Sequence, residues 1–201
     1  MRQWGVARTA RAAVDRLVRS YRCIVTHNPL AGPPAADHVG DVVFRLATPS
    51  DFDRLGELEP YGRGSRHRTY VENDRDWLFV ACHGERIVAT RRVSLVLRDE
   101  VIARVLRLEP GQVWGADVFC LPEYRSRGIA RQLQRFGDRF MASLGYTERL
   151  GTILVSNTPS LRMSRGGGRL PLYYITYLRV LFWERLRVSK DIPRRYWDDL
   201  K

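Results

Sequence analysis

The run from Leu121 to Ala130 reads Leu-Pro-Glu-Tyr-Arg-Ser-Arg-Gly-Ile-Ala, and its residue types and spacing suit it to bind a phosphate group. An apolar run at 113–120 precedes it, and apolar residues at one-face helical spacing follow it. This pattern predicts a strand, a tight loop and a helix. Main-chain N–H groups at a helix start are unpaired and partly positive, so they can hold a pyrophosphate without a metal ion. Gly128 lacks the Cβ that would keep a phosphate away from the backbone.

The spacing Arg125-x-x-Gly128-x-Ala130 resembles motif A of the GNAT superfamily of acyl-CoA-dependent N-acetyltransferases, and the preceding Leu-Pro-Glu-Tyr is common in that family. A helix that begins at a tight glycine turn for structural reasons alone is the alternative. The resemblance covers roughly residues 42–183 and implies acetyl-CoA, or a longer acyl-CoA, as co-substrate, with no metal. The cofactor-binding residues that it implies are Phe119, Cys120, Leu121, Arg125, Ser126, Arg127, Gly128, Ile129, Ala130 and Asn157.

The order of the predicted elements, β, α, β, β, β, α, β, α, β, is that of the GNAT fold. We therefore expect an α/β (α+β) protein with flanking helices and a mixed, mostly antiparallel central sheet that is splayed open at the CoA site. Strands are predicted at 42–46, 77–82, 87–96, 113–120, 152–155 and 170–182, and 101–108 is a candidate for one further strand outside this order. Thr48 and Pro49 predict a helix start, and 61–75 is expected to be a loop or broken helix near the acceptor site.

Acyl transfer to an amine needs a polarised carbonyl and a base that removes a proton from the ammonium. The resemblance places Cys120 at the end of the strand where a main-chain N–H polarises the carbonyl, and the alternative is a nucleophilic thiol. Asp117 lies in an otherwise apolar run, where a buried carboxylate costs free energy, so it is the predicted catalytic base. An Asp at a β-bulge, or one paired with an Arg, is the alternative. His67 and His83 are weaker candidates because both lie in apparent loops.

The leaving CoA thiolate needs a proton, and the resemblance implies a Tyr for this step. The family pattern is Asn, two residues, Ala, three residues, Tyr. Asn157 and Ser160 fit its first two positions, but Ser164 stands at the Tyr position. We predict that Ser164, a weaker acid than a phenol, hydrogen-bonds the sulfur or positions a water, with Tyr173 or Tyr174 as substitutes. Asn157 is expected to touch the pantetheine arm or to cap the following helix.

The 201 residues predict a single domain at 41–201, with an appendage at 1–40 that consists of a basic amphipathic helix (1–22) and a linker (28–39). Four interpretations of that helix stay open: packing on the domain, contact with an anionic membrane or an acyl-carrier protein, contact with RNA, and a cleaved targeting segment. No apolar run approaches the ~20 residues of a membrane span. Three cysteines, an odd number, favour a reducing setting, so the protein is expected to be cytoplasmic or peripheral at a membrane.

The net charge of +12 implies attraction to something anionic. Almost all basic residues are Arg, which we attribute to base composition, so nucleic acid is not an expected partner. The sequence predicts transfer of an acetyl group from acetyl-CoA to a primary amine of a small molecule by direct attack. The alternatives are a long-chain N-acyltransferase, similar to N-acyl amino acid synthases, that uses acyl-carrier protein or acyl-CoA, and a non-catalytic CoA-binding module. The sequence predicts neither the acceptor's identity nor an oligomeric state.

Overall fold

A computed structural model describes residues 18–30, 36–61 and 64–199. These residues form two compact units. The larger unit comprises residues 27–151, and the smaller one combines residues up to 26 with those from 152 onward. The chain passes from one unit to the other within β1 (Val18–Pro29) and within β7 (Glu148–Leu154).

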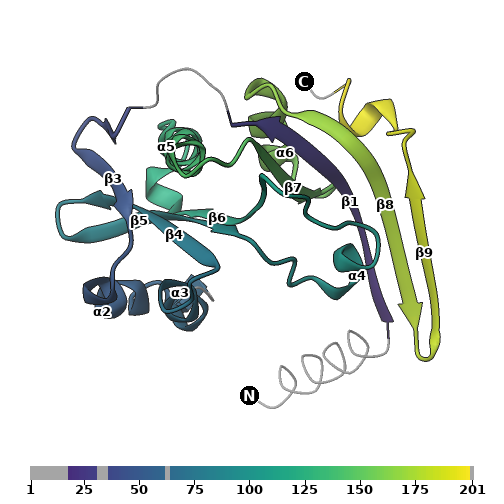
Figure 1. Ribbon diagram of the computed structural model, residues 1–201, viewed down its shortest axis with the longest axis horizontal. Helices are drawn as coiled ribbons and strands as arrows, with labels where there is room; N and C mark the ends of the chain where they lie inside the picture. The colour runs from purple at the N-terminus through teal and green to yellow at the C-terminus, as the bar shows by residue number, and fades with distance from the viewer. Residues whose placement is uncertain (1–17, 31–35, 62–63, 200–201) are drawn as a thin grey trace, which may run out of the picture. The chain divides into compact units, whose positions relative to one another are not determined.

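The larger unit is a mixed sheet covered on both faces by helices. Its strands β2 (His38–Val39), β3 (Val42–Leu46), β4 (Asp76–His83), β5 (Arg86–Ser94) and β6 (Gln112–Cys120) pair antiparallel in that order, and β6 pairs in parallel with β7. Its helices are α2 (Phe52–Gly56), α3 (Gly64–Val71), α4 (Glu100–Ala103) and α5 (Ile129–Ser143), with short 3-10 turns at 49–51, 59–61 and 122–124. Figure 1 shows α5 on one face of β3–β5, and α2 with α3 on the other. The predicted fold class is confirmed.

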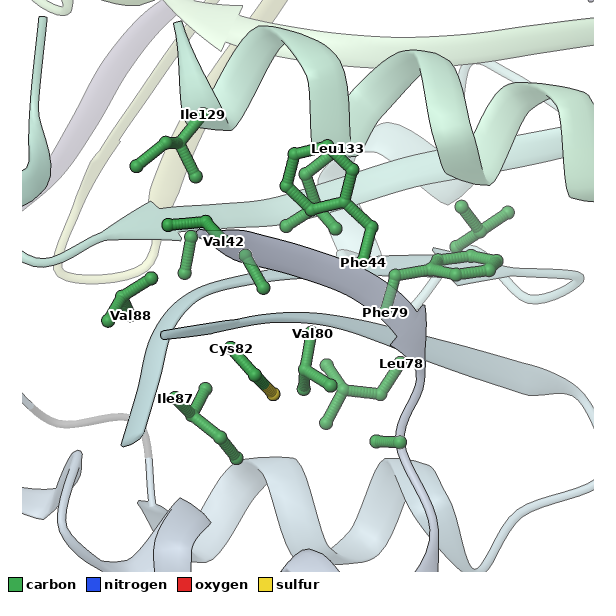
Figure 2. Close-up of a cluster of buried hydrophobic side chains, with 14 of the residues drawn as sticks. Val42, Phe44, Leu78, Phe79, Val80, Cys82, Ile87, Val88, Ile129 and Leu133 are labelled. Atoms are coloured by element: carbon green, nitrogen blue, oxygen red, sulfur yellow. The ribbon is translucent and has the colours of Figure 1, made fainter. Parts of the chain in front are cut away.

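The core of this unit has two layers because successive side chains of a strand leave opposite faces. Figure 2 shows Phe44 and Phe79 turned toward α5 with Leu133, and Cys82 and Ile87 turned the other way. On the α5 side, the ring of Phe79 meets those of Phe136 and Phe140 edge to face, at 6.1 and 5.4 Å between centroids. Each such buried side chain stabilises the fold by roughly 1.5–3 kcal/mol. This packing fixes α5, and therefore its first turn, against the sheet.

Strands β6 and β7 pair only at their beginnings. The ladder joins Gln112–Trp114 to Glu148–Leu150, whereas β6 continues to Cys120. The later half of β6 therefore pairs with its antiparallel partner β5, as Cys120 does with Ala89, but not with its parallel partner β7. This is the opening that the sequence predicts in the central sheet.

The smaller unit contains part of β1, α6 (Thr158–Gly166) and the antiparallel hairpin of β8 (Leu170–Val180) and β9 (Trp183–Ser189), followed by a 3-10 turn at 194–196. Its core consists of Ile24, Ile153, Leu161 and Trp197. The rings of Tyr174 and Tyr196 stack at 5.8 Å beside it.

Three local predictions are wrong. Residues 18–22, predicted as the end of a helix, begin strand β1, and its buried run Cys23–Val25 shows that sheet packing overrides the helical spacing. Strand 101–108 is replaced by α4, because the Asp99 side chain accepts hydrogen bonds from the N–H groups of Val101 and Ile102 and caps a helix. The predicted linker at 28–39 includes the end of β1 and all of β2. The helix prediction for residues 1–17 lies outside the described residues.

Candidate active site

The chain between β6 and α5 turns tightly and leaves its last residues exposed. The N–H of Leu121 donates to the carbonyl of Val88 at 2.9 Å, which ties the start of the loop to β5. A 3-10 turn follows, and the N–H of Arg125 donates to the carbonyl of Pro122 at 3.2 Å. Ser126 and Gly128 then adopt positive φ angles of 61° and 78°. The predicted sequence of strand, loop and helix is therefore present.

Helix α5 begins at this loop with its first N–H groups available. Gly128 occupies the N-cap position, and no side chain of the described residues caps the helix there. The first main-chain bond runs from the N–H of Gln132 to the carbonyl of Gly128, at 3.0 Å. A Cβ built on Gly128 would meet no atom within 4 Å, so the space beside this backbone is open. The N–H groups of the first turn can therefore receive an anion.

The side chains of the predicted cofactor-binding residues divide into two groups. Leu121 and Ile129 are buried in the core, so only their main-chain atoms are available to a ligand. The stretch 125–128 is exposed, and Ala130 is half-buried in the first turn of α5. Apart from Asn157, the predicted cofactor-binding residues belong to the larger unit and lie on one continuous stretch of chain.

Two arginines of the loop have partners within it. The Nε of Arg125 donates to the carbonyl of Cys120 at 3.1 Å, so this side chain braces the loop. The guanidinium of Arg127 lies 5.2 Å from the ring centre of Tyr124, whose hydroxyl is 2.8 Å from Nδ1 of His83. A cavity of about 320 Å³ lies beside Arg127 and Tyr124, and the β2–β3 turn forms its other wall.

Cys120 and Phe119 end strand β6. Burial raises the pKa of the Cys120 thiol, which disfavours the thiolate that a covalent nucleophile requires. This direction supports the main-chain role predicted for Cys120. The ring of Phe119 lies 5.3 Å from that of Tyr61, at the start of the segment predicted to lie near the acceptor.

Asp117 lies in a β-bulge and forms an ion pair with an arginine. Between the register pairs Thr90 with Phe119 and Arg92 with Ala116, β6 has one more residue than β5. Asp117 takes a φ of 48°, a left-handed conformation that costs free energy outside glycine. Its Oδ2 lies 3.2 Å from Nε of Arg92. The structure thus shows both features of the alternative interpretation, while the carboxylate stays partly exposed.

Arg92 connects Asp117 to a larger polar cluster that sequence reasoning missed. Its Nη1 lies 3.3 Å from Oδ1 of the buried Asp76, which also pairs with Arg98. Its guanidinium lies 4.2 Å from the ring centre of Tyr70 on α3. The available signal was the charged pair at 91–92 inside an otherwise apolar strand. An arginine there must be buried with a counterion or must serve a site.

His67 and His83 are both expected to be surface residues in loops, and the structure contradicts this for His67. His67 lies on α3, where it is buried with its Nε2 3.4 Å from the hydroxyl of Thr90, so the prediction of a surface loop histidine is wrong. His83 ends strand β4 and is exposed.

Asn157 and Ser164 belong to the smaller unit. The Oδ1 of Asn157 accepts a hydrogen bond from the N–H of Ser160 at 3.2 Å, which confirms the predicted cap of the following helix. Its contact with pantetheine stays a prediction. Ser164 is only 1% exposed, and its hydroxyl has no hydrogen-bond partner among the described residues. Tyr173 and Tyr174, the predicted substitutes, are half-buried on β8.

Two further properties concern metal ions and membranes. Within residues 18–30, 36–61 and 64–199, no three His, Cys, Asp or Glu side chains are grouped so that they could hold a metal ion. In the same ranges, no helix combines the length and apolar character needed to cross a bilayer.

A family model described as acetyltransferase (GNAT) family matches residues 44–166. No curated protein matches the chain in a sequence comparison. Among solved structures, a Drosophila protein is 12% identical with a TM-score of 0.60, and the match covers 89% of this chain and 58% of that one. A structure assigned to the GNAT family, from Novosphingobium aromaticivorans, is 19% identical with a TM-score of 0.58, covering 87% and 66%. Arabidopsis thaliana NAA60 in complex with acetyl-CoA is 16% identical with a TM-score of 0.51, covering 74% and 97%.

At these identities the solved structures show a shared fold. The chain spans 58% and 66% of the length of the first two of them.

Proposed function

The chain belongs to the GNAT acetyltransferase family, and from that membership we propose that it transfers an acetyl group from acetyl-CoA to a primary amine of a small molecule by direct attack. The observation that carries this proposal is the loop at 125–130, where α5 begins without a side-chain cap beside open space. N–H groups arranged in this way bind phosphate. The NAA60 structure, which shares the fold, contains acetyl-CoA.

The pyrophosphate of CoA is proposed to bind the first turn of α5. The donors are the N–H groups from Ser126 to Ala130, with the exposed Arg127 adding positive charge. Arg125 acts indirectly, because its Nε already holds the carbonyl of Cys120. The pantetheine arm then runs along the later half of β6, which has left β7.

The thioester carbonyl is proposed to be polarised by main-chain N–H groups at the end of β6. A bulge takes a residue out of the ladder and so frees its main-chain groups, and this bulge lies three residues before Cys120. A preformed donor of this kind stabilises the negative charge that develops on the oxygen during attack. The thiol of Cys120 takes no covalent part.

Asp117 is proposed to accept the proton of the attacking amine, directly or through a water molecule. An amine with a pKa near ~10 is mostly protonated at neutral pH and attacks only after losing that proton. Arg92 fixes the direction of the Asp117 carboxylate through the 3.2 Å ion pair. The carboxylate's partial exposure lets the amine approach. Arg92 is therefore a positioning residue and Asp117 the catalytic one.

The role of Ser164 as a hydrogen-bond donor to the sulfur of CoA stays a prediction that rests on its place in the family pattern of the sequence. The Ser164 hydroxyl is buried without a partner in the described residues, and a buried hydroxyl costs free energy until it is paired. A Ser164→Ala variant should lower kcat modestly and leave the affinity for CoA nearly unchanged. An equal loss in Tyr173→Phe or Tyr174→Phe would transfer the role to that tyrosine.

The acceptor is proposed to lie between Asp117 and the aromatic side chains on the α2–α3 side of the sheet. Tyr61 and Phe119 lie ring against ring there, and Tyr70 covers the guanidinium of Arg92. Aromatic faces and a carboxylate together suit an organic ammonium ion.

The test is a thermal-shift titration with acetyl-CoA and longer acyl-CoAs, followed by thiol release against a set of amines. Gly128→Glu should abolish stabilisation by acetyl-CoA, because it places a carboxylate against the pyrophosphate. Gly145→Glu is the matched control: Gly145 also has a positive φ, 89°, and a Cβ there would also meet open space. Equal responses of both variants to acetyl-CoA would contradict the proposed site. If long-chain acyl-CoA stabilised the protein and acetyl-CoA did not, the acyl donor would be a long-chain acyl-CoA and not acetyl-CoA.

A further inference from the structure

The turn between β8 and β9 exposes four consecutive large apolar residues. Phe182 is 101% exposed, Leu181 and Trp183 are about half-exposed, and Val180 is the fourth. Val180 pairs with Trp183, so Leu181 and Phe182 form a two-residue turn at the free end of the hairpin (Figure 1). We call Val180–Trp183 the hairpin tip.

The hairpin tip contradicts the usual chemistry of such turns. Leu181 has a φ of 54°, a conformation for which two-residue hairpins use Gly, Asn or Asp. A Leu there costs free energy, and a fully exposed Phe beside it contributes nothing to the core. The stability of the fold therefore does not account for these residues.

Positive charge lies directly behind the hairpin tip. Alternation along β9 places Trp183, Arg185 and Arg187 on one face, and both arginines are exposed. At roughly 3.3 Å per residue, Arg185 lies about 7 Å and Arg187 about 13 Å along the strand from Trp183. The single acid of β9, Glu184, lies on the opposite face and accepts a hydrogen bond from Tyr177.

We propose that the hairpin tip inserts into the interface of an anionic lipid membrane, with Arg185 and Arg187 at the level of the phosphate head groups. Apolar side chains of peripheral proteins reach roughly 5–10 Å into this boundary, and Trp favours it because its ring is apolar and its N–H is polar. Each arginine near an anionic surface adds about 1 kcal/mol. The chain's net charge of +12 attracts it to the same surface.

A second copy of the chain fits these observations less well. A stable protein interface buries roughly 800 Å² on each partner, far more than the side chains of one turn provide. Strand β9 carries Glu184, Arg185 and Arg187, and charged residues along an edge oppose pairing with another strand.

Vesicle flotation of the full chain tests the proposal. We expect binding to vesicles of equal parts phosphatidylcholine and phosphatidylserine, and much weaker binding to phosphatidylcholine alone. Leu181→Gly combined with Phe182→Asn restores favourable turn residues and should weaken binding at least about tenfold. Arg185→Gln with Arg187→Gln should weaken binding to the anionic vesicles by about thirtyfold, from about 1 kcal/mol for each charge. Leu144→Asn removes an equally exposed leucine elsewhere and should change nothing.

Several results would overturn the proposal. One is absence of wild-type binding, another is undiminished binding by the Leu181→Gly, Phe182→Asn variant, and a third is equal binding to neutral and anionic vesicles. Light scattering after gel filtration gives the competing outcome: if the tip variant dissociates an oligomer while vesicle binding is unchanged, a second copy covers the tip. Brominated lipids add a positional readout, because they should quench the wild type more strongly than Trp183→Phe.

Discussion

Arg91 and Arg92 are neighbours on β5 but point to opposite faces of the sheet, Arg91 toward α5 and Arg92 toward α3. The Arg91 side chain is completely buried. It donates to the main-chain carbonyl of Gln134 and, at 2.5 Å, to Oδ1 of Asp138. Arg149 of β7 approaches the same carboxylate at 2.9 Å. This cluster joins β5, α5 and β7, and its carboxylate side chain is only 13% exposed.

The cluster on the other face is open at one end. Arg92 lies between Asp76, whose side chain has no exposed surface, and Asp117, whose side chain is 28% exposed. The Asp138 carboxylate is held by two arginines and is only 13% exposed, whereas Asp117 presents a more accessible carboxylate at a bulge in the strand that leads to the loop. The proposed catalytic role of Asp117 therefore goes with the cluster in which one partner of the buried arginine remains accessible.

Asp138→Ala should have the largest effect, a loss of about 3–5 kcal/mol of stability, because it removes the carboxylate with which the buried Arg91 and Arg149 both pair. Urea unfolding followed by circular dichroism measures it. Asp74→Ala, at an exposed position, is the control and should cost almost nothing. A loss below about 1 kcal/mol for Asp138→Ala would show that water reaches the cluster and would remove the contrast between the two faces.

Asp117→Asn should act on catalysis instead of stability. We expect kcat to fall by about 10²-fold, the loss typical of removing a general base, with the affinity for acetyl-CoA nearly unchanged. Stability should change little because Arg92 keeps its partner Asp76. Asp76→Asn is the matched comparison and should reduce stability more than Asp117→Asn does. If Asp117→Asn left the pH–rate profile unchanged, Asp117 would be structural, like Asp138.

Asp51 sharpens the comparison between buried and accessible carboxylates. It precedes α2, on the same side of the sheet as Arg92, yet its side chain is completely buried. Arg45 donates to both of its oxygens, at 2.6 and 2.7 Å, and lowers the pKa of Asp51 from 3.8 to about 2. A carboxyl whose pKa is lowered by folding stabilises the protein above its unfolded pKa and loses that contribution as the pH falls through the folded one. Asp51→Asn should therefore cost about 2 kcal/mol at neutral pH.

That difference from wild type should shrink between pH 4 and pH 2, as urea unfolding at several pH values would show. Asp74→Asn, at an exposed position, provides the control. If the stability difference between wild type and Asp51→Asn stayed constant down to pH 2, Asp51 would act through the geometry of its hydrogen bonds and not through its charge. A difference that shrinks as expected would support closure of the ion pair, and not its face of the sheet, as the feature that separates structural carboxylates from the proposed catalytic one.

Sequence periodicity correctly predicted the helices and strands whose apolar residues follow one spacing and form one packed face. The helix from Ile129 and the strand before it are present because their spacing matches one packed face each. β1 was missed because residues 14–21 also fit a helical spacing, and only pairing with distant strands decides between the two. The loop that is proposed to bind phosphate was predictable because its turn and the helix start depend on consecutive residues. The pairing of Arg92 with Asp117 was not, because it depends on the register of β5 with β6 and on a bulge.

Arg92→Lys should have the smallest effect and tests the open cluster most finely. Lysine keeps the charge between Asp76 and Asp117 but loses the planar contact with the Tyr70 ring, which is worth roughly 0.5–1 kcal/mol. Arg91→Lys is the matched change one residue away. Arg91→Lys should cost more stability, because one ammonium group cannot replace the guanidinium that donates to both Gln134 and Asp138. The site is also tightly packed: a Cβ added to Gly137 would lie only 2.6 Å from the Arg91 guanidinium. If urea unfolding gave equal losses for the two variants, the open end at Asp117 would be as rigid as the Arg91 cluster, and its carboxylate could not adjust to an incoming amine.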